Sequence, residues 1–159
     1  MKLKVIIKHA IFIGNFYSGK MIFGIGTDLI SVSRIKKITA KFEEKFEEKI
    51  FTENEIIKAN RFKGDNSSLL KASYYAKRFA AKEALAKALG LGIGRGIDFK
   101  DIEIDNDELG RPFIKILNDK EQFIKNRFKS KTIAINLSLA DEKSGDNSFA
   151  LAMVIISSN

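Results

Sequence analysis

The sequence of 159 residues contains no cysteine, one histidine and one proline. The absence of cysteine excludes disulfides and thiolate metal sites, and it is consistent with a reducing cytoplasm. Because the one histidine, His9, lies in an atypical N-terminal stretch, we expect neither histidine-based catalysis nor a histidine metal site. The sequence shows no internal repeat, low-complexity tail or linker rich in Pro or Ser. Its length and its 45% hydrophobic content predict a single domain with a sizeable core.

The charge balance is basic, with 28 Lys and Arg residues against 20 Asp and Glu and a formal net charge of +8. A basic surface attracts nucleic acids, acidic proteins and phosphorylated cofactors alike, so charge alone does not identify the partner. The sequence is also rich in Lys, Ile and Asn, a bias that an AT-rich genome produces. The aromatic residues are mainly Phe at spacings typical of a core, and no recognised nucleic-acid-binding motif is present. We therefore expect no nucleic-acid partner.

Residues 1–20 are interpreted as an extension of the domain. Two early lysines precede an apolar run that is similar to a signal peptide, but Lys8 and His9 interrupt the run and no clear cleavage site follows. The stretch is too short and too broken to span a membrane, so we expect no membrane association. We interpret Met21 as the native start and residues 21–159 as the single domain.

The longest run of strong helix formers covers residues 78–89 and stops at Gly90, which suits a left-handed C-cap. At about 100° per residue, alanines point in several directions around this helix and no broad polar face remains. We therefore predict a central helix that neighbouring elements approach closely on several sides. Glu83 and Lys87 lie nearly opposite its apolar stripe, either as an ordinary i,i+4 surface pair or as part of a site.

A second carboxylate, Asp28, favours a site over a surface pair. In residues 21–30, MIFGIGTDLI, an apolar strand runs into small residues and then into this aspartate. Such a pattern is expected where a strand ends at a site. Mg²⁺ commonly takes one or two protein carboxylates and fills its other positions with water and phosphate oxygens. Asp28 at a strand end and Glu83 on a buried helix are therefore candidate Mg²⁺ ligands.

The remaining pattern predicts an α+β fold in which a mostly antiparallel sheet packs on the long central helix. A first helix is expected at about 31–50, and the capping box from Thr52 to Glu55 starts a second one. Arg61 and Lys63 beside the next loop are either ordinary surface charges or phosphate contacts. The other expected boundaries are the end of the second helix at about 62, strands at 99–104 and 113–117, a helix at about 119–128, and strands at 132–139 and 148–156 around a turn at 141–147.

Four ordered motifs together resemble holo-(acyl-carrier-protein) synthase, a 4′-phosphopantetheinyl transferase. They are residues 24–30 with Arg34 after them, residues 78–87, the glycine loop 90–96, and residues 108–113. The resemblance runs from about Met21 to the C-terminus and implies a 4′-phosphopantetheinyl transferase-like fold. It also implies a cytoplasmic enzyme of fatty acid biosynthesis. Its reaction would transfer 4′-phosphopantetheine from coenzyme A to a serine of apo acyl carrier protein, with release of 3′,5′-ADP.

The resemblance implies roles for single residues. Asp28 and Glu83 would hold Mg²⁺ on the pyrophosphate of coenzyme A, and Lys87 would offset the developing charge. The general base stays open between a metal-bound water, Glu83 and Asp141. Many relatives carry Ser-His or Thr-His where this chain has Ala140 and Asp141, so a histidine contact to the cofactor is not expected. The residues expected to contact coenzyme A or to orient the site are Arg78, Lys82, Lys87, Gly90, Gly94 and Asp141.

The same resemblance implies two protein partners. Arg34 would face the acidic helix of the carrier protein, unless it is an ordinary surface arginine. Members of this short type are typically homotrimers with a cofactor site at each subunit junction, so residues near Asp141 or in the loop 90–96 would complete a neighbour's site. The strand at 149–156 would then pack against another copy, although a buried core strand gives the same pattern. A non-catalytic interaction domain on the same fold is the alternative function, and the presence of both candidate metal ligands argues against it.

Overall fold

The computed structural model describes residues 21–142 and 148–158 and, for Glu43, the backbone only. The expectations for residues 1–20 and for the turn at 143–147 lie outside these described residues. Three strands, β1 (Ile22–Ser31), β4 (Ala134–Glu142) and β5 (Phe149–Ser157), form an antiparallel sheet in the order β1-β5-β4. Together with the helices that pack on it, this sheet confirms the predicted α+β fold.

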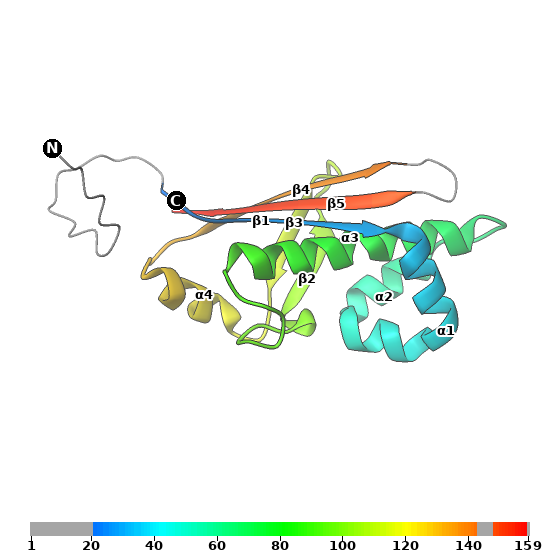
Figure 1. Cartoon of the computed structure of the whole chain (residues 1–159), viewed down its shortest axis with the longest axis horizontal. Coiled ribbons are helices and arrows are strands. Elements are labelled where there is room, and N and C mark those ends of the chain that lie inside the picture. Colours follow the sequence, from blue (N-terminus) through cyan, green and yellow to red (C-terminus); the bar gives the residue numbers. More distant parts are fainter. Residues whose placement is uncertain (1–20, 143–147, 159) are drawn as a thin grey trace, which may run out of the picture.

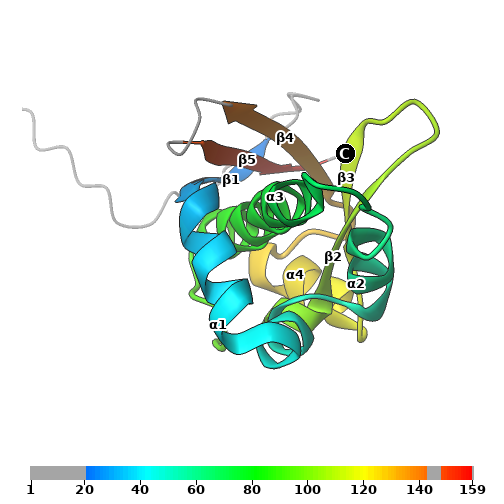
Figure 2. The same cartoon turned by 90° about the vertical axis from the view of Figure 1, so that its right-hand side faces the viewer.

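The long helix α3 (Ser67–Ala88) lies along one face of the three-stranded sheet (Figure 1). In the end-on view of Figure 2, the sheet lies on one side of α3 while the other helices and a second pair of strands surround its remaining sides. Alanines are buried in several directions around the helix because these neighbours approach its backbone closely. The central helix that the alanine pattern predicts is therefore confirmed, with an N-terminal part longer than the run of strong helix formers.

Two helices, α1 (Val32–Ile50) and α2 (Glu53–Ala59), lie beside the N-terminal half of α3. α1 continues directly from β1. α2 begins at the predicted capping box, in which Thr52 Oγ1 accepts a hydrogen bond from the Glu55 N–H and the Glu55 carboxylate accepts one from the Thr52 N–H at 2.8 Å. It ends earlier than expected. The fourth helix, α4 (Lys120–Phe128), lies near the opposite end of α3 (Figure 1).

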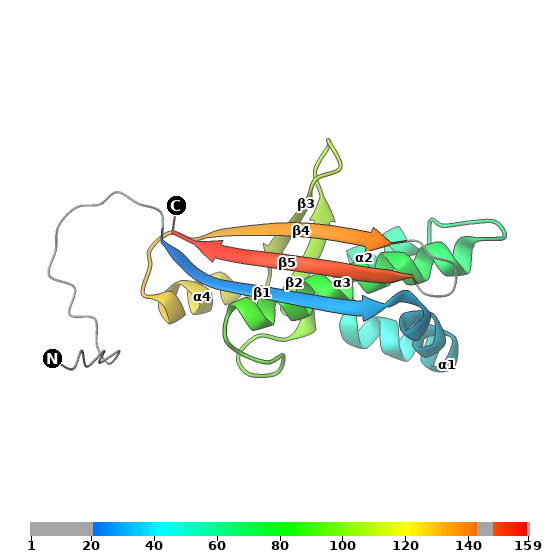
Figure 3. The same ribbon diagram turned by 45° about the horizontal axis from the view of Figure 1, so that its top comes forward.

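A separate hairpin of β2 (Ile102–Asn106) and β3 (Pro112–Ile116) forms a two-stranded antiparallel sheet. Figure 3 shows its tip projecting past the β4 edge of the larger sheet. The prediction of a strand from residue 99 is wrong for its first residues, which form the single turn η1 (Phe99–Asp101). The Asp101 carboxylate accepts a hydrogen bond from the Asp98 N–H at 2.8 Å, and this local cap favours a turn over an extended chain.

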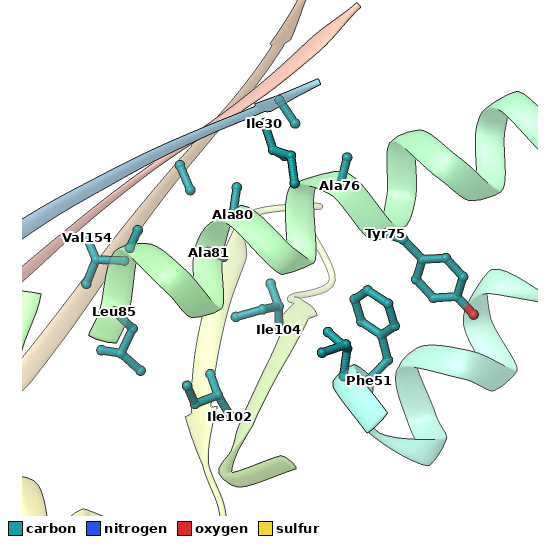
Figure 4. Close-up of a cluster of buried hydrophobic side chains, with 14 of the residues drawn as sticks. Ile30, Phe51, Tyr75, Ala76, Ala80, Ala81, Leu85, Ile102, Ile104 and Val154 are labelled. Carbon is teal, nitrogen blue, oxygen red and sulfur yellow. The ribbon is translucent and has the colours of Figure 1, made fainter. Parts of the chain in front are cut away.

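The core fills the space on both sides of α3 (Figure 4). Ile30 and Val154 of the sheet pack on one side of the helix, whereas Ile102 and Ile104 of β2 lie on the other. At the end of the helix that adjoins α1, Tyr75 stacks on a phenylalanine ring with centroids 4.2 Å apart.

Within the described part of the chain, the helices are too short or too polar to cross a membrane.

Candidate active site

Asp28, Glu83 and Lys87 lie together where β1 passes over α3. Successive residues of a strand point to opposite faces, and the face of β1 that carries Asp28 is the one that packs on α3. Glu83 and Lys87 are one helical turn apart on α3. The Lys87 ammonium lies 2.8 Å from a carboxylate oxygen of Asp28, and Asp28 also acts electrostatically on Glu83. The three residues expected for metal binding and charge neutralisation therefore share one surface.

Gly24 and Gly26 allow β1 to lie close enough to α3 for Asp28 to reach Lys87 and Glu83. A methyl group on Gly24 would lie 1.9 Å from the carbonyl oxygen of Ala88, and one on Gly26 would lie 2.0 Å from that of Ala84. Both distances are far below van der Waals contact, so only glycine fits at either position. These two packing residues were missed in the sequence. Their signal was the spacing of Gly24, Gly26 and Asp28 on one strand face, opposite small residues on the helix.

The electrostatics of the surface favour a bound cation. Burial first, and then the negative charge of Asp28, raises the pKa of Glu83 above its ordinary value, while Lys87 opposes that rise. The Lys87 ammonium also donates a hydrogen bond to the backbone carbonyl of Thr27 at 3.0 Å. Lys87 thus acts as a stand-in cation beside the two carboxylates.

The two carboxylates fit a metal that takes few protein ligands. Within residues 21–142 and 148–158, no group of three or more acidic or histidine side chains is arranged to hold a metal ion. Mg²⁺ does not need such a group, because it commonly accepts one or two carboxylates together with water and phosphate oxygens. Asp28, with a side chain 16% exposed, and the partly buried Glu83 offer that donor set.

Lys82 does not join this surface. Its side chain is fully buried, and its ammonium donates to the Glu55 carboxylate at 2.7 Å and to the backbone carbonyls of Ile50 at 2.8 Å and Phe99 at 3.1 Å. A phosphate contact would require Lys82 to leave these three oxygens. Of the two roles expected for it, phosphate contact and orientation of the site, this placement fits only the second. The partner, Glu55, was noticed in the sequence only as a helix cap.

Arg78 also points away from Glu83, toward the β2–β3 hairpin. Its guanidinium lies over the Tyr74 ring at 3.3 Å from the ring centroid and donates to the Asn106 side chain at 3.2 Å. Among the described residues, the buried side-chain atoms without a hydrogen-bond partner are Arg78 Nε and the Tyr74 hydroxyl. The Nε–H of Arg78 therefore has no partner, and of the two roles expected for this residue, cofactor contact and orientation of the site, its contacts fit the second.

The expected cofactor loop and Asp141 lie at separate places. Gly90 forms the end of α3 with a φ of 65°, and Gly94 has a φ of 84° and donates to the carbonyl of Ile97 at 2.9 Å. Both are exposed, as a loop that approaches a ligand requires. The expectation that Asp141 sits on a turn is wrong, because the β4–β5 ladder continues to Glu142.

Asp141 faces α3 from the far strand of the sheet. It pairs with Ala150 of β5, and its carboxylate lies 3.3 Å from both the Lys77 ammonium and the Ser73 hydroxyl. Lys77 lies N-terminal to Glu83 on α3, and Asp141 lies across β5 from β1. Within one chain, the structure thus brings Asp28, Glu83 and Lys87 together but keeps Asp141 apart from them.

Two other surfaces concern partners. Arg34 is exposed in the first turn of α1. A groove of about 690 Å³ lies between α1, α2 and the start of α3, and it includes neither Asp28 nor Glu83. The face of the large sheet that points away from α3, here called the outer sheet face, carries large apolar side chains that are 41–62% exposed: Ile25, Leu29, Phe149, Leu151 and Met153.

Comparisons with known proteins agree on one family. The model of the 4′-phosphopantetheinyl transferase superfamily matches residues 24–154. A holo-[acyl-carrier-protein] synthase of Wolbachia pipientis is 44% identical over 136 residues, which are 86% of this chain and 98% of the relative. A second one, of Zymomonas mobilis, is 42% identical over 86% of this chain and 96% of that relative. The crystal structure of a Bacillus anthracis holo-(acyl-carrier-protein) synthase in complex with CoA (3′,5′-ADP) is similar with a TM-score of 0.66 and 37% identity, over 87% of this chain and 99% of the other. A Plasmodium yoelii acyl carrier protein synthase with ADP bound gives a TM-score of 0.73 and 32% identity, over 89% of this chain and 99% of the other.

Proposed function

Given that this chain belongs to the 4′-phosphopantetheinyl transferase superfamily, we propose that Asp28 and Glu83 form the Mg²⁺ site of its active centre. The chain is a holo-(acyl-carrier-protein) synthase, which transfers phosphopantetheine from coenzyme A to apo acyl carrier protein. The single observation that carries the metal site is the placement of two carboxylates near the stand-in ammonium of Lys87, which lies 2.8 Å from Asp28 and acts electrostatically on Glu83. Bound Mg²⁺ would supply positive charge to the pyrophosphate of coenzyme A.

The chain's own residues are proposed to align the reactants and neutralise charge. The serine hydroxyl oxygen of the carrier bonds to the β-phosphorus of coenzyme A, the bond to the bridging oxygen breaks, and 3′,5′-ADP leaves with that oxygen. Such phosphoryl transfer depends on positioning and electrostatics more than on covalent chemistry by the protein. Lys87, with a side chain 52% exposed beside Asp28, is free enough to turn its ammonium to the phosphates. Arg78 and Lys82 support the site by orienting α3.

The proton of the serine needs an acceptor, and two side chains are candidates. Glu83 lies beside Asp28, and its raised pKa makes it a better proton acceptor near neutral pH than an ordinary glutamate. Asp141 lies on β4, the strand across β5 from that of Asp28, and is held there by Lys77. Glu83 therefore suits a site built from one chain, whereas Asp141 enters only as a contribution from a neighbour.

A closed cyclic trimer is proposed as the active assembly, with the exposed glycines Gly90 and Gly94 or residues near Asp141 completing the site of the next chain. The support is the outer sheet face, because soluble monomers rarely expose apolar patches of several large side chains. Light scattering should give three chains per particle, and Leu151→Glu should lower that number. If Asp28→Asn and Asp141→Ala are each inactive, mixing the two variants should restore activity. A monomer that stays fully active on dilution would contradict the shared site.

The carrier protein is proposed to dock beside the exposed Arg34, in the cytoplasm and in support of fatty acid biosynthesis. Acyl carrier proteins are acidic, and a peripheral positive charge on the enzyme speeds the encounter with an acidic partner. The basic net charge of the chain supports the same partner. Neither nucleic acid nor a membrane is part of this proposal.

The activity and its metal are tested in one assay. The protein is incubated with coenzyme A and apo acyl carrier protein, in Mg²⁺ or in chelator, and the carrier is weighed by mass spectrometry. We expect the phosphopantetheine mass only with Mg²⁺. Asp28→Asn and Glu83→Gln should each lower turnover by about 100-fold or more, because several kcal/mol of charge stabilisation are lost. Glu121→Gln on α4 is the control, and near-normal Mg²⁺-dependent turnover in either site variant would refute the metal assignment.

A further inference from the structure

We propose that the buried ion pair of Lys82 and Glu55 is a positioning device that fixes the rotation of α3 about its axis and thereby aims Glu83 at Asp28. The inference rests on the proposed function, in which Glu83 is a metal ligand. Lys82 precedes Glu83 directly, so any turn of the helix at Lys82 moves Glu83 with it.

The contacts of Lys82 leave its ammonium no freedom. It has three N–H donors, and the three oxygens within hydrogen-bonding distance come from Ile50 at the end of α1, Glu55 in α2 and Phe99 in η1. The side chains of both Lys82 and Glu55 are 0% exposed. One point of α3 is therefore tied to three separate segments that lie away from the large sheet.

Both carboxylate oxygens of Glu55 also accept hydrogen bonds. One carboxylate oxygen accepts from Lys82 at 2.7 Å and from the Thr52 N–H at 2.8 Å, and the other accepts from the Ile104 N–H of β2 at 2.9 Å. The carboxylate thus connects the start of α2 with β2 and with α3. Because β2 and α2 are themselves packed in the core, the pair transmits their position to the helix.

Stability alone does not account for this pair. Removing two charges from water is costly, and buried ion pairs are often no more stabilising than apolar residues of the same size. Burial lowers the pKa of Lys82, and the nearby Glu55 charge opposes that shift. A pair that gives little net stability can still select one arrangement of the helix, since any other arrangement leaves a buried charge without its partner.

The opposite side of α3 needs such a constraint. There the helix meets β1 through Gly24 and Gly26 against Ala84 and Ala88. These residues set the distance between strand and helix, but they have no long side chains that interlock and resist rotation. Lys87 does bond to Asp28 and Thr27 across this contact, but its side chain is 52% exposed and constrains the helix less than a buried pair. Glu83 lies about 100° from Lys82 around the helix, and its carboxylate is about 5 Å from the axis. A rotation of about 20° would move it by about 2 Å, and misplacements of about 1 Å cost up to about 100-fold in rate.

The test compares two double variants that remove one ion pair each from the same helix. Lys82→Met with Glu55→Gln removes both buried charges and keeps an amide oxygen for the cap of α2. The matched control is Lys71→Met with Glu47→Gln, because that pair also lies at 2.7 Å and also ties α3 to a neighbouring helix, farther from Glu83. Measured for each are the urea midpoint, the binding of Mn²⁺ by electron paramagnetic resonance, and kcat and KM for both substrates.

We expect the Lys82/Glu55 double variant to stay folded while its Mn²⁺ affinity falls at least tenfold and its kcat falls 10- to 100-fold, with the KM for the carrier protein unchanged. The Lys71/Glu47 control should keep both Mn²⁺ affinity and kcat, whatever its urea midpoint. If the Lys82/Glu55 variant binds Mn²⁺ and turns over like wild type, or if both double variants lose activity only in proportion to stability, the positioning role is refuted.

Two further variants distinguish a failure of the positioning inference from a failure to fold and from a failure of the proposed metal site. If the double variant does not fold, Lys82→Gln with Glu55→Gln serves the same purpose, because it also removes both buried charges and keeps an amide N–H donor at position 82. It should lower Mn²⁺ affinity and kcat, and wild-type values would refute the proposal. Glu83→Gln reports on the proposed function itself. If Glu83→Gln binds Mn²⁺ normally, the metal assignment has failed. If Glu83→Gln loses Mn²⁺ while the Lys82/Glu55 variant does not, only the positioning inference has failed.

Discussion

Replacing Gly26 by alanine should separate β1 from α3. The new methyl carbon would lie 2.0 Å from the Ala84 carbonyl oxygen and 2.5 Å from the Ala88 nitrogen. Both are backbone atoms of a packed helix, so no change of side-chain rotamer relieves the clash. Ordinary contact needs about 3.4 Å, and the strand must therefore move by more than about 1 Å.

The loss of folding free energy caused by this movement lies at the upper end of the range that is usual for an overpacked core. Overpacking a core costs about 1–3 kcal/mol, and two backbone clashes at one methyl justify about 3 kcal/mol. Alanine also lowers the conformational entropy of the unfolded chain relative to glycine, which stabilises the folded state by about 0.4–1 kcal/mol. A net loss of about 2 kcal/mol lowers the urea midpoint by about 1 M, since small proteins have slopes of about 1–3 kcal/mol per M.

Activity should fall as well, because Asp28 lies two residues farther along the displaced strand. Urea unfolding followed by circular dichroism and the mass-spectrometric transfer assay measure the two effects. Gly92→Ala is the matched control, since a methyl group there meets nothing within 4 Å and the backbone needs no positive φ. If Gly26→Ala unfolds at the same urea concentration as Gly92→Ala, the close packing of β1 on α3 is not what holds Asp28 in place.

Three further predictions concern single charges. Arg34→Ala should raise the KM for the carrier protein severalfold and leave the KM for coenzyme A unchanged, because a peripheral charge mainly affects encounter; equal KM values in wild type and variant would make it an ordinary surface residue. Lys87→Met should tighten Mn²⁺ binding by up to about fivefold, because a partly exposed ion pair that competes with the metal is worth about 0.2–1 kcal/mol; weaker binding would contradict the stand-in role. Glu83 has a raised pKa in the folded protein, so the folded state holds this proton more tightly and wild type loses stability as the pH rises from the ordinary glutamate pKa through the raised one. The melting temperature of Glu83→Gln should therefore rise relative to that of wild type as the pH increases above the ordinary glutamate pKa of about 4.3, and a difference that stays constant with pH would contradict the shift.

Local patterns in the sequence were sufficient to predict the central helix and to single out Asp28 and Glu83, whose role as metal ligands stays a prediction. Helix formers ending at Gly90 and alanines in all directions predict a buried helix, because propensity and periodicity act over a few neighbouring residues. Asp28 after an apolar strand and Glu83 on that helix were recognisable in the same way, and the four ordered motifs led to the family. The capping box at Thr52 was equally local and is confirmed.

Two strand boundaries were predicted wrongly, one because of pairing between distant strands and one because of a local side-chain cap. Asp141 was expected on a turn, but the ladder between β4 and β5 extends past it, and hydrogen bonds between distant strands leave no local signal. Phe99 was expected in a strand, but a side-chain cap at Asp98 and Asp101 formed a turn instead. In both cases a contact outside the alternating pattern determined the backbone.

The partners of the charged residues were also beyond the sequence. Lys87 could pair with Glu83 in its own helix, yet the tertiary structure gives it Asp28, which is 59 residues away. Lys82 was expected either to contact phosphate or to orient the site, and the tertiary structure encloses it with Glu55, which is 27 residues away. The sequence by itself determined which residues carry charge and which helix carries them. Only the packing of β1, α2 and β2 around α3 decided which charges meet, because burial makes an unpaired charge costly and so selects the partner that the fold brings within reach.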